Sequence, residues 1–91
     1  MKIFDWDDEK NMWLKEERGI SFEEVVFCIT TGNLVDIVPN KNQEKYPRQN
    51  IFVVNVDGYI HLVPFDETDD CVLLRTIIPS RKATKTYLRG D

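Results

Sequence analysis

The sequence contains a single histidine and two cysteines, and their spacing excludes the common zinc sites. His61, Cys28 and Cys71 stand apart, and no CxxC or HxxxH pattern occurs. No apolar run approaches the roughly 20 residues that a membrane-spanning helix needs. Residues 1–8 are too acidic for a secretory signal peptide. We therefore expect a cytoplasmic protein that contacts no membrane, has no structural metal and keeps both cysteines reduced.

Repeats, low-complexity tracts and Gly- or Pro-rich linkers are also missing from the chain. Its 91 residues are 42% hydrophobic and 31% charged, which is typical of a folded chain and argues against disorder. A chain of this length lies near the small end of those that an apolar core alone can stabilise. We therefore expect one domain that spans residues 1–91.

Two helices are predicted in the first third of the chain. Asp7 is a suitable N-cap for the first helix, and Gly19 is suited to the left-handed position that ends it. Ser21 and Glu24 form an S-x-x-E capping box at the start of the second helix, which ends near Gly32. The second helix has one apolar face, formed by Phe22, Val25, Val26 and Ile29.

From residue 34 the pattern becomes that of β-strands. Four runs are predicted to be strands: Leu34–Val38, Ile51–Val56, Tyr59–Val63 and Cys71–Ile78. Asp57-Gly58 is a strong signal for a two-residue hairpin turn in which both residues have positive φ. Ser80 is a suitable cap for a last short helix, Arg81–Leu88. The order ααββββα predicts an α+β fold: two N-terminal helices, an antiparallel sheet of about four strands, and a short C-terminal helix, with all helices on one side.

Charge is distributed unevenly along the chain. The net charge is −4, yet the last seventeen residues hold five of the twelve Lys and Arg residues against one acid, Asp91, which gives this stretch +4. Arg81, Lys85 and Arg89 are spaced to share one helix face, with Lys82 on its flank and Arg75 in the strand before. Such a face is suited to phosphate, because Arg offers a fork of donors and Lys a compact charge. The same cations would equally serve to solvate a terminal helix.

Other candidate residues lie in the predicted sheet and its loops. His61 is the one side chain whose ordinary pKa suits acid–base catalysis near neutral pH, although a histidine within a strand is more often structural. Tyr46 lies between Lys45 and Arg48 in a polar loop, where it can stack on an unpaired base or simply hold the loop. The acidic stretch 66–70 lacks the glycine and the distal glutamate of an EF-hand loop, so we expect a solvated hairpin tip there.

Three blocks of the sequence resemble the BrnT family of type II toxins. They are Phe4–Lys10 (F-D-W-D-x-x-K), Arg18–Glu24 (R-G-I-S-F-E-E) and Ser80–Lys85 (S-R-K-A-T-K). The family typically shows F-x-W-D-x-x-K, K-H-G-V-S-F-E-E and A-R-[RK]-A-T in the same order. Two positions differ, since Glu17 and Arg18 stand where the family has lysine and histidine.

The resemblance implies a RelE-like fold and endoribonuclease activity, with no metal or organic cofactor. It also implies a cognate antitoxin, usually a ribbon-helix-helix DNA-binding protein, through which alone the toxin would reach operator DNA. Arg81, Lys82 and Lys85 match the closing basic block, and Lys10 matches the opening block.

Residues and resemblance together give two hypotheses. In the first, the protein is an RNA endonuclease. Its candidate catalytic residues are Arg75, Arg81, Lys85 and His61, and its candidate RNA contacts are Lys10, Tyr46, Arg48, Lys82 and Arg89. In the second, a non-catalytic protein keeps the toxin fold and acts only by binding a partner, an alternative that the acidic balance and the changes at Glu17 and Arg18 favour.

Overall fold

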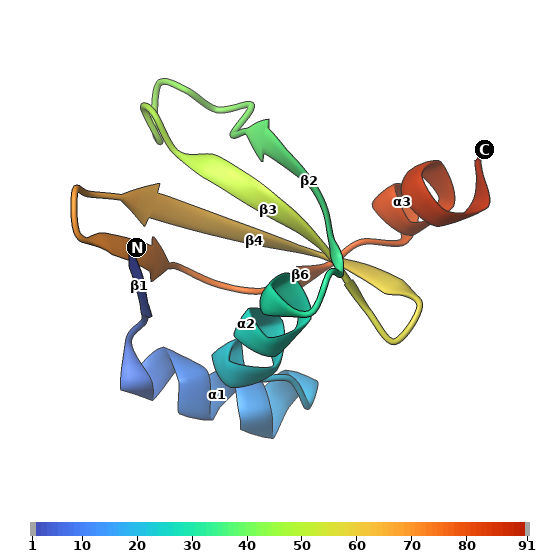
Figure 1. Ribbon diagram of the computed structural model, residues 1–91, viewed down its shortest axis with the longest axis horizontal. Helices are drawn as coiled ribbons and strands as arrows, with labels where there is room; N and C mark the ends of the chain where they lie inside the picture. The colour runs from blue at the N-terminus through green and yellow to red at the C-terminus, as the bar shows by residue number, and fades with distance from the viewer. Residues whose placement is uncertain (1, 91) are drawn as a thin grey trace.

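The computed structural model describes residues 2–90 and has the α+β architecture that the sequence predicts (Figure 1). Its helices are α1 (Asp8–Arg18), α2 (Phe22–Thr30) and α3 (Arg81–Thr84), and α3 continues into a π-helical turn, η1 (Lys85–Arg89). Its strands are β1 (Ile3–Asp5), β2 (Leu34–Pro39), β3 (Asn50–Val56), β4 (Tyr59–Glu67), β5 (Cys71–Leu74) and β6 (Ile78–Pro79). They form one six-stranded sheet in the order β1-β5-β4-β3-β2, with β6 paired to β4.

The ends of α1 and α2 follow the predicted local signals. The Asp7 side chain accepts a hydrogen bond from the Glu9 backbone N–H at 2.9 Å, and Gly19 ends α1 with φ of 65°. The Ser21 hydroxyl accepts from the Glu24 backbone N–H at 3.1 Å. These bonds satisfy backbone groups that a helix end leaves without an internal partner. The two predicted helices are therefore confirmed.

Asn11 joins α1 to α2. Its side chain is 5% exposed, its Oδ1 accepts from the Phe22 backbone N–H at 2.8 Å, and its Nδ2 donates to Glu23 Oε1 at 2.7 Å. The bond from Asn11 is the main reason that the pKa of the Glu23 carboxyl lies below its ordinary value. A lowered pKa means that this contact stabilises the fold above the ordinary pKa and is lost as the pH falls through the lowered one. The effect is small because Glu23 is exposed.

β3 and β4 form the predicted hairpin. Asp57 and Gly58 have φ of 52° and 83°, so both turn residues are left-handed, as expected. Pairing runs from Val56↔Tyr59 to Asn50↔Phe65. β4 extends to Glu67, beyond the predicted end at Val63, because its outer part pairs with β5.

Replacing Gly58 with valine is expected to destabilise the protein by about 1–2 kcal/mol, because a β-branched residue would have to adopt a left-handed backbone. A Cβ at this position would meet no other atom within 4 Å, so the penalty is conformational rather than steric. Thermal unfolding would measure it. Gly58→Asn is the control, since asparagine tolerates this conformation, and an unchanged melting temperature for Gly58→Val would contradict the expectation.

The sheet has more strands than predicted and is not purely antiparallel. β1 pairs with β5 in parallel, with Ile3 opposite Cys71, whereas the sequence predicted no strand there. The predicted strand Cys71–Ile78 is divided into β5 and β6, which pair with successive parts of β4. Between them the chain leaves the ladder and buries Ile77 completely in the core.

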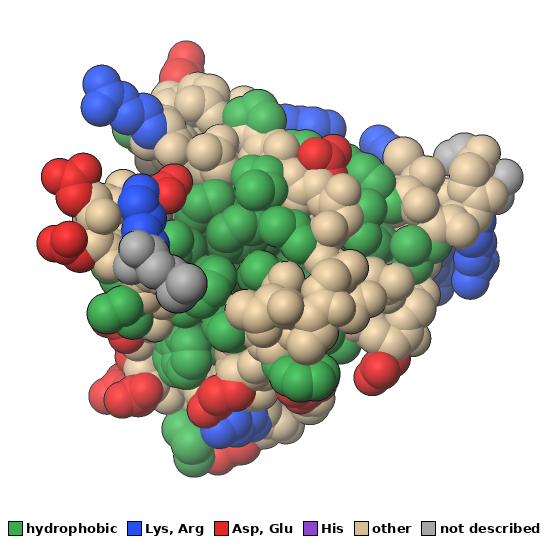
Figure 2. Space-filling view, viewed as in Figure 1, with side chains coloured by type: hydrophobic (Ala, Val, Ile, Leu, Met, Phe, Trp, Pro, Cys, Tyr) green, Lys and Arg blue, Asp and Glu red, His purple; other side chains and the backbone are tan. Residues whose placement is uncertain are grey.

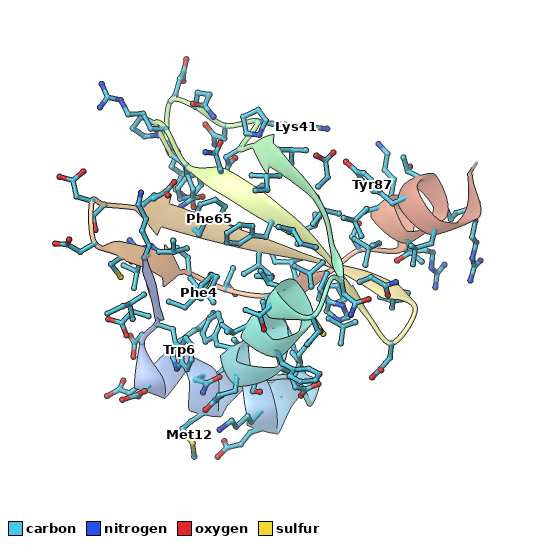
Figure 3. The ribbon with its side chains drawn as sticks, in the orientation of Figure 1. Phe4, Trp6, Met12, Lys41, Phe65 and Tyr87 are labelled. Atoms are coloured by element: carbon cyan, nitrogen blue, oxygen red, sulfur yellow. The ribbon has the colours of Figure 1, made fainter. Side chains whose placement is uncertain are left out.

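Helices cover both faces of the sheet, so the prediction that they share one side is wrong. Phe22 of α2 and Leu14 of α1 pack with one face, on which Phe4 and Phe65 lie (Figure 3). Val53 and Ile60 point to the other face, are almost fully buried, and lie outside that core cluster. α3 packs near them, apart from α1 and α2 (Figure 1). β3 is thus buried on both faces, which its unbroken apolar run indicates.

Three further expectations concern membrane helices, metals and cysteines. Within residues 2–90, no helix is long and apolar enough to cross a membrane. The same residues include no group of three His, Cys, Asp or Glu side chains that is placed to hold a metal ion. Cys28 and Cys71 are free thiols, and both are half-buried rather than fully buried.

Candidate functional site

α3 is fixed to β4 by hydrogen bonds from Thr84. Its hydroxyl is buried, accepts from the Ile60 backbone N–H at 2.8 Å and donates to the Ser80 carbonyl at 2.7 Å. The Ser80 backbone N–H in turn donates to the Ile60 carbonyl at 3.0 Å. The Ser80 hydroxyl accepts from the Ala83 backbone N–H at 3.0 Å, as predicted for a cap. That bond satisfies one backbone N–H that the helix start would otherwise leave without a partner.

Replacing Thr84 with valine is expected to lower the free energy of unfolding by about 1–3 kcal/mol, because the buried Ile60 N–H loses its acceptor. Thr84→Ser retains the hydroxyl and should recover most of this loss. Chemical denaturation of the three proteins would measure the difference. Equal stability of the valine and serine variants would show that the hydroxyl does not fix α3.

Three of the predicted cations lie around one cleft beside α3. Arg81, Lys85 and Arg89 line a space of about 310 Å³ together with Tyr59 and Thr84, and we call it the basic cleft. The predicted common face is therefore confirmed, although the helix changes from α to π within it. Within residues 2–90, no carboxylate lies within ion-pair distance of these three cations. Their charge is available to an anion from outside.

His61 lies next to the basic cleft rather than in it. Its ring is 5.7 Å from that of Tyr59, centroid to centroid, and the two rings meet edge to face. Its Nδ1 is 3.1 Å from the Tyr59 carbonyl oxygen. A carbonyl only accepts hydrogen bonds, so this contact favours the tautomer with the proton on Nδ1, which leaves Nε2 as the proton-accepting nitrogen.

Arg75 and Tyr46 meet in a different cleft, between the loop 40–49 and the sheet. This loop cleft holds about 400 Å³ and is lined by Asn40, Lys45, Tyr46, Pro47, Gln49, Pro64, Asp66, Arg75, Thr76 and Ile78. Arg75 Nε lies 2.8 Å from Asp66 Oδ2, and Lys45 Nζ lies 5.4 Å from the centre of the Tyr46 ring. Arg75 was predicted to act beside Arg81, but each lines a separate cleft.

A third space, the middle cleft, adjoins the loop cleft on the same face of the sheet. It holds about 230 Å³ and is lined by Lys41, Leu62, Ser80, Lys82, Ala83, Thr86 and Tyr87. Leu62 pairs with Ile78 of the loop cleft. The Tyr87 hydroxyl donates to Asp36 Oδ2 of β2 at 3.0 Å, and this bond raises the pKa of Tyr87 above its ordinary value (Figure 3).

The three clefts concentrate positive charge on an acidic protein. Seven of the twelve Lys and Arg residues line them, whereas Asp66 is the one acid that does so among residues 2–90. Lys and Arg side chains project from the C-terminal helix on the right of Figure 2, while acidic side chains border α1 and the tip between β4 and β5. An anionic molecule is therefore attracted to this part of the surface.

Two of the predicted RNA contacts lie elsewhere. Lys10 belongs to α1, on the opposite face of the sheet, where its Nζ lies 4.5 Å from the centre of the Trp13 ring. Arg48 is in the loop 40–49 with φ of 64°, and it does not line the loop cleft. Arg18, at the position of the family histidine, donates from Nη1 to the Ile77 carbonyl at 2.6 Å, which is a structural contact.

The clefts also include residues that sequence reasoning did not single out as candidate site residues. Among them are Tyr59 in the basic cleft, Lys41 in the middle cleft, and Lys45 and Gln49 in the loop cleft. The lysines carried a signal, since both belong to the polar, basic stretch between two strands. Nothing in the sequence around Tyr59 indicates a site, because its position beside α3 depends on how that helix packs against the sheet.

Comparisons of the chain with protein-family models, with curated proteins and with solved structures gave no match. The function of the clefts must therefore be inferred from their own geometry and charge.

Proposed function

We propose that the protein is an RNA endonuclease toxin of the BrnT family, which cuts RNA without a metal and is neutralised by a cognate antitoxin. The observation that carries the proposal is the clustering of seven of the twelve Lys and Arg residues around three neighbouring clefts with a single acid. Phosphates of a nucleic acid are anions that Lys and Arg side chains neutralise, so such a surface attracts them. The three sequence blocks that resemble the family support the same function.

The basic cleft is the proposed place of reaction. RNA can be cut when the 2′-oxygen loses its proton and bonds to the adjacent phosphorus, while the bond from phosphorus to the 5′-oxygen breaks and that oxygen takes up a proton. Negative charge develops on the phosphate oxygens during this step. Arg81 and Lys85 stabilise that charge, and Arg89 holds a neighbouring phosphate.

His61 is the proposed acceptor of the 2′-hydroxyl proton. Its Nδ1 faces the Tyr59 carbonyl, so its Nε2 is the basic nitrogen, and its ring meets that of Tyr59, which lines the basic cleft. Arg75 is separated from this cleft, so we assign it to binding the RNA chain, together with Tyr46 and Lys82, rather than to the reacting phosphate.

Expression and cleavage assays test the proposed function. Production of the protein alone should stop cell growth, and production of the neighbouring gene product with it should restore growth. Purified protein should cut RNA in the presence of EDTA. Normal growth together with intact RNA would refute the proposal.

The proposed antitoxin covers the basic cleft with an acidic segment, because carboxylates can occupy a site that attracts phosphates. Association should therefore be faster at low salt, since screening shortens electrostatic attraction to about 8 Å at physiological ionic strength. Association rates across a salt series, for the wild type and for Arg81→Ala/Lys85→Ala, would measure this. If neither salt nor the substitutions change the rate, the antitoxin binds elsewhere and leaves the basic cleft open.

A second candidate function is partner binding without catalysis. Phe27 of α2 and Ile37 of β2 are large apolar side chains that are 67% and 50% exposed, and a contiguous patch of such side chains can mark a protein–protein interface. Figure 2 shows hydrophobic side chains gathered over the sheet, between β2 and the N-terminal helices. If the protein is never toxic, and if Arg81→Glu/Lys85→Glu abolishes partner binding, then binding is its function.

A further inference from the structure

The loop cleft has the size of a site for a small organic group. It holds about 400 Å³, within the range of roughly 300–1,000 Å³ that is common for such sites. One wall is the loop 40–49, and the opposite wall is formed by Pro64 of β4, Ile78 of β6 and Thr76, which lies between β5 and β6. The basic cleft, in contrast, is lined by three cations together with Tyr59 and Thr84.

An aromatic ring and a cation lie together on the loop wall. Tyr46 is 39% exposed, and Lys45 Nζ lies 5.4 Å from the centre of its ring. The loop is held by its own hydrogen bonds, since the Tyr46 backbone N–H donates to the Asn42 carbonyl at 2.9 Å and the Gln49 N–H donates to the Tyr46 carbonyl at 3.2 Å. These bonds hold the backbone that carries the ring, and a planar group can stack on the exposed ring.

Arg75 supplies an oriented cation on the sheet side. Its backbone N–H donates to the Pro64 carbonyl at 2.9 Å, and its Nε lies 2.8 Å from Asp66 Oδ2. These contacts fix the guanidinium through one edge. Within residues 2–90 its two terminal nitrogens have no hydrogen-bond partner, and its side chain is 53% exposed, so they can bind a phosphate.

Amide groups form the remaining wall. Gln49 is 5% exposed, and its Oε1 accepts from Asn40 Nδ2 at 2.8 Å. Its Nε2 reaches Asp66 Oδ1 only at 3.4 Å, which is a long and weak bond. A buried amide with one weak bond can donate to an acceptor on the edge of a base instead.

We propose that the loop cleft is a nucleotide subsite, in which one unpaired base of RNA stacks on Tyr46, its edge meets Gln49 and Asn40, and its phosphate contacts Arg75 and Lys45. A bare phosphate would use only the cations and leave the ring and amides without a role. The inference rests on the proposed function, in which RNA is cut at the basic cleft. Lys41 and Lys82 line the middle cleft, and a strand that extends from the subsite toward α3 would pass them. Such a subsite would make cleavage depend on the base that it binds.

Binding of short RNA strands tests the subsite apart from catalysis. The probes are fluorescent 2′-O-methyl pentanucleotides of a single base type, which cannot be cut because their 2′-oxygen carries no proton. Tyr46→Ala should weaken binding of the preferred pentanucleotide about 10-fold, and Tyr46→Phe should not, since stacking is retained. Arg75→Gln should also weaken it, and inorganic phosphate should compete with the same affinity for wild type and Tyr46→Ala.

Trp13→Ala is the matched control. Like Tyr46, Trp13 is an exposed aromatic residue beside cations, here Lys10 and Arg18, but it belongs to α1 and lines none of the three clefts. Its removal should leave the affinity unchanged. Equal affinities for wild type, Tyr46→Ala and Arg75→Gln, or an equal loss with Trp13→Ala, would overturn the subsite. If binding depends on Tyr46 but the wild type cuts no RNA, the subsite stands and the proposed nuclease function fails.

Discussion

Replacing Arg81 and Lys85 together with alanine is expected to lower the rate of RNA cleavage by about 100-fold or more. Both side chains line the basic cleft, and among residues 2–90 neither has an ion-pair partner. Their charge can therefore act on the phosphate, where loss of even one stabilising donor commonly costs 100- to 1,000-fold. Single-turnover cleavage of a defined RNA in EDTA would measure the change.

The control for this experiment removes two cations from outside the clefts. Lys2 and Lys15 pair with Glu67 and Glu23, at 2.6 Å and 3.7 Å, and line none of the three clefts. Lys2→Ala/Lys15→Ala changes the net charge equally and should leave cleavage within a factor of about three, because exposed ion pairs contribute little to stability. If both double variants lose activity to the same extent, net charge rather than the basic cleft determines the rate.

Replacing Phe22 with alanine is expected to lower the free energy of unfolding by about 3–5 kcal/mol. The side chain is fully buried between α2 and the sheet, and its ring stacks on Trp6 with 5.7 Å between centroids. A domain of this size has a total stability of roughly 5–15 kcal/mol, so the loss is a large share of it. We expect the melting temperature to fall by more than about 12 °C.

Phe27 offers a matched control in the same helix. It is 67% exposed, so Phe27→Ala should change the free energy of unfolding by no more than about 0.5 kcal/mol. Denaturant titration of the two variants and the wild type would compare them directly. Similar losses for both would mean that α2 does not face the sheet as described.

Local signals predicted the parts of the fold that depend on neighbouring residues. Asp7, Gly19 and Ser21 fix helix ends within a few positions of themselves, and Asp57-Gly58 fixes a turn of two residues. Such features need no distant partner, which is why one sequence was enough to place them.

Features that depend on distant partners were missed. β1 has only three residues, and its pairing with Cys71–Leu74 has no local signature. The division of the last predicted strand follows from the burial of Ile77, which the run of apolar residues does not distinguish from continued pairing. The position of α3 on the second face was readable in principle, because β3 buries Phe52, Val53 and Val54 in succession.

In the candidate site, too, features set by neighbouring residues were predicted and features set by distant residues were missed. Helical spacing placed Arg81, Lys85 and Arg89 on one face, and the structure brings them together. Spacing gave no means of seeing that Arg75 lies with Tyr46 in a separate cleft, since that depends on the path of the chain between β5 and β6. Whether these residues act on RNA stays a prediction for the assays above.

The parallel pairing of β1 with β5 has a consequence for the order of folding. The contacts of the β3–β4 hairpin join segments that are close in the chain, and they can form early. β1 must instead close a loop that reaches from Ile3 to Cys71, and the entropy of that closure has to be met before any hydrogen bond is gained. We therefore expect β1 to join the sheet after the other strands, although it lies at the start of the chain. Its backbone amides should be among the first to exchange hydrogen with solvent.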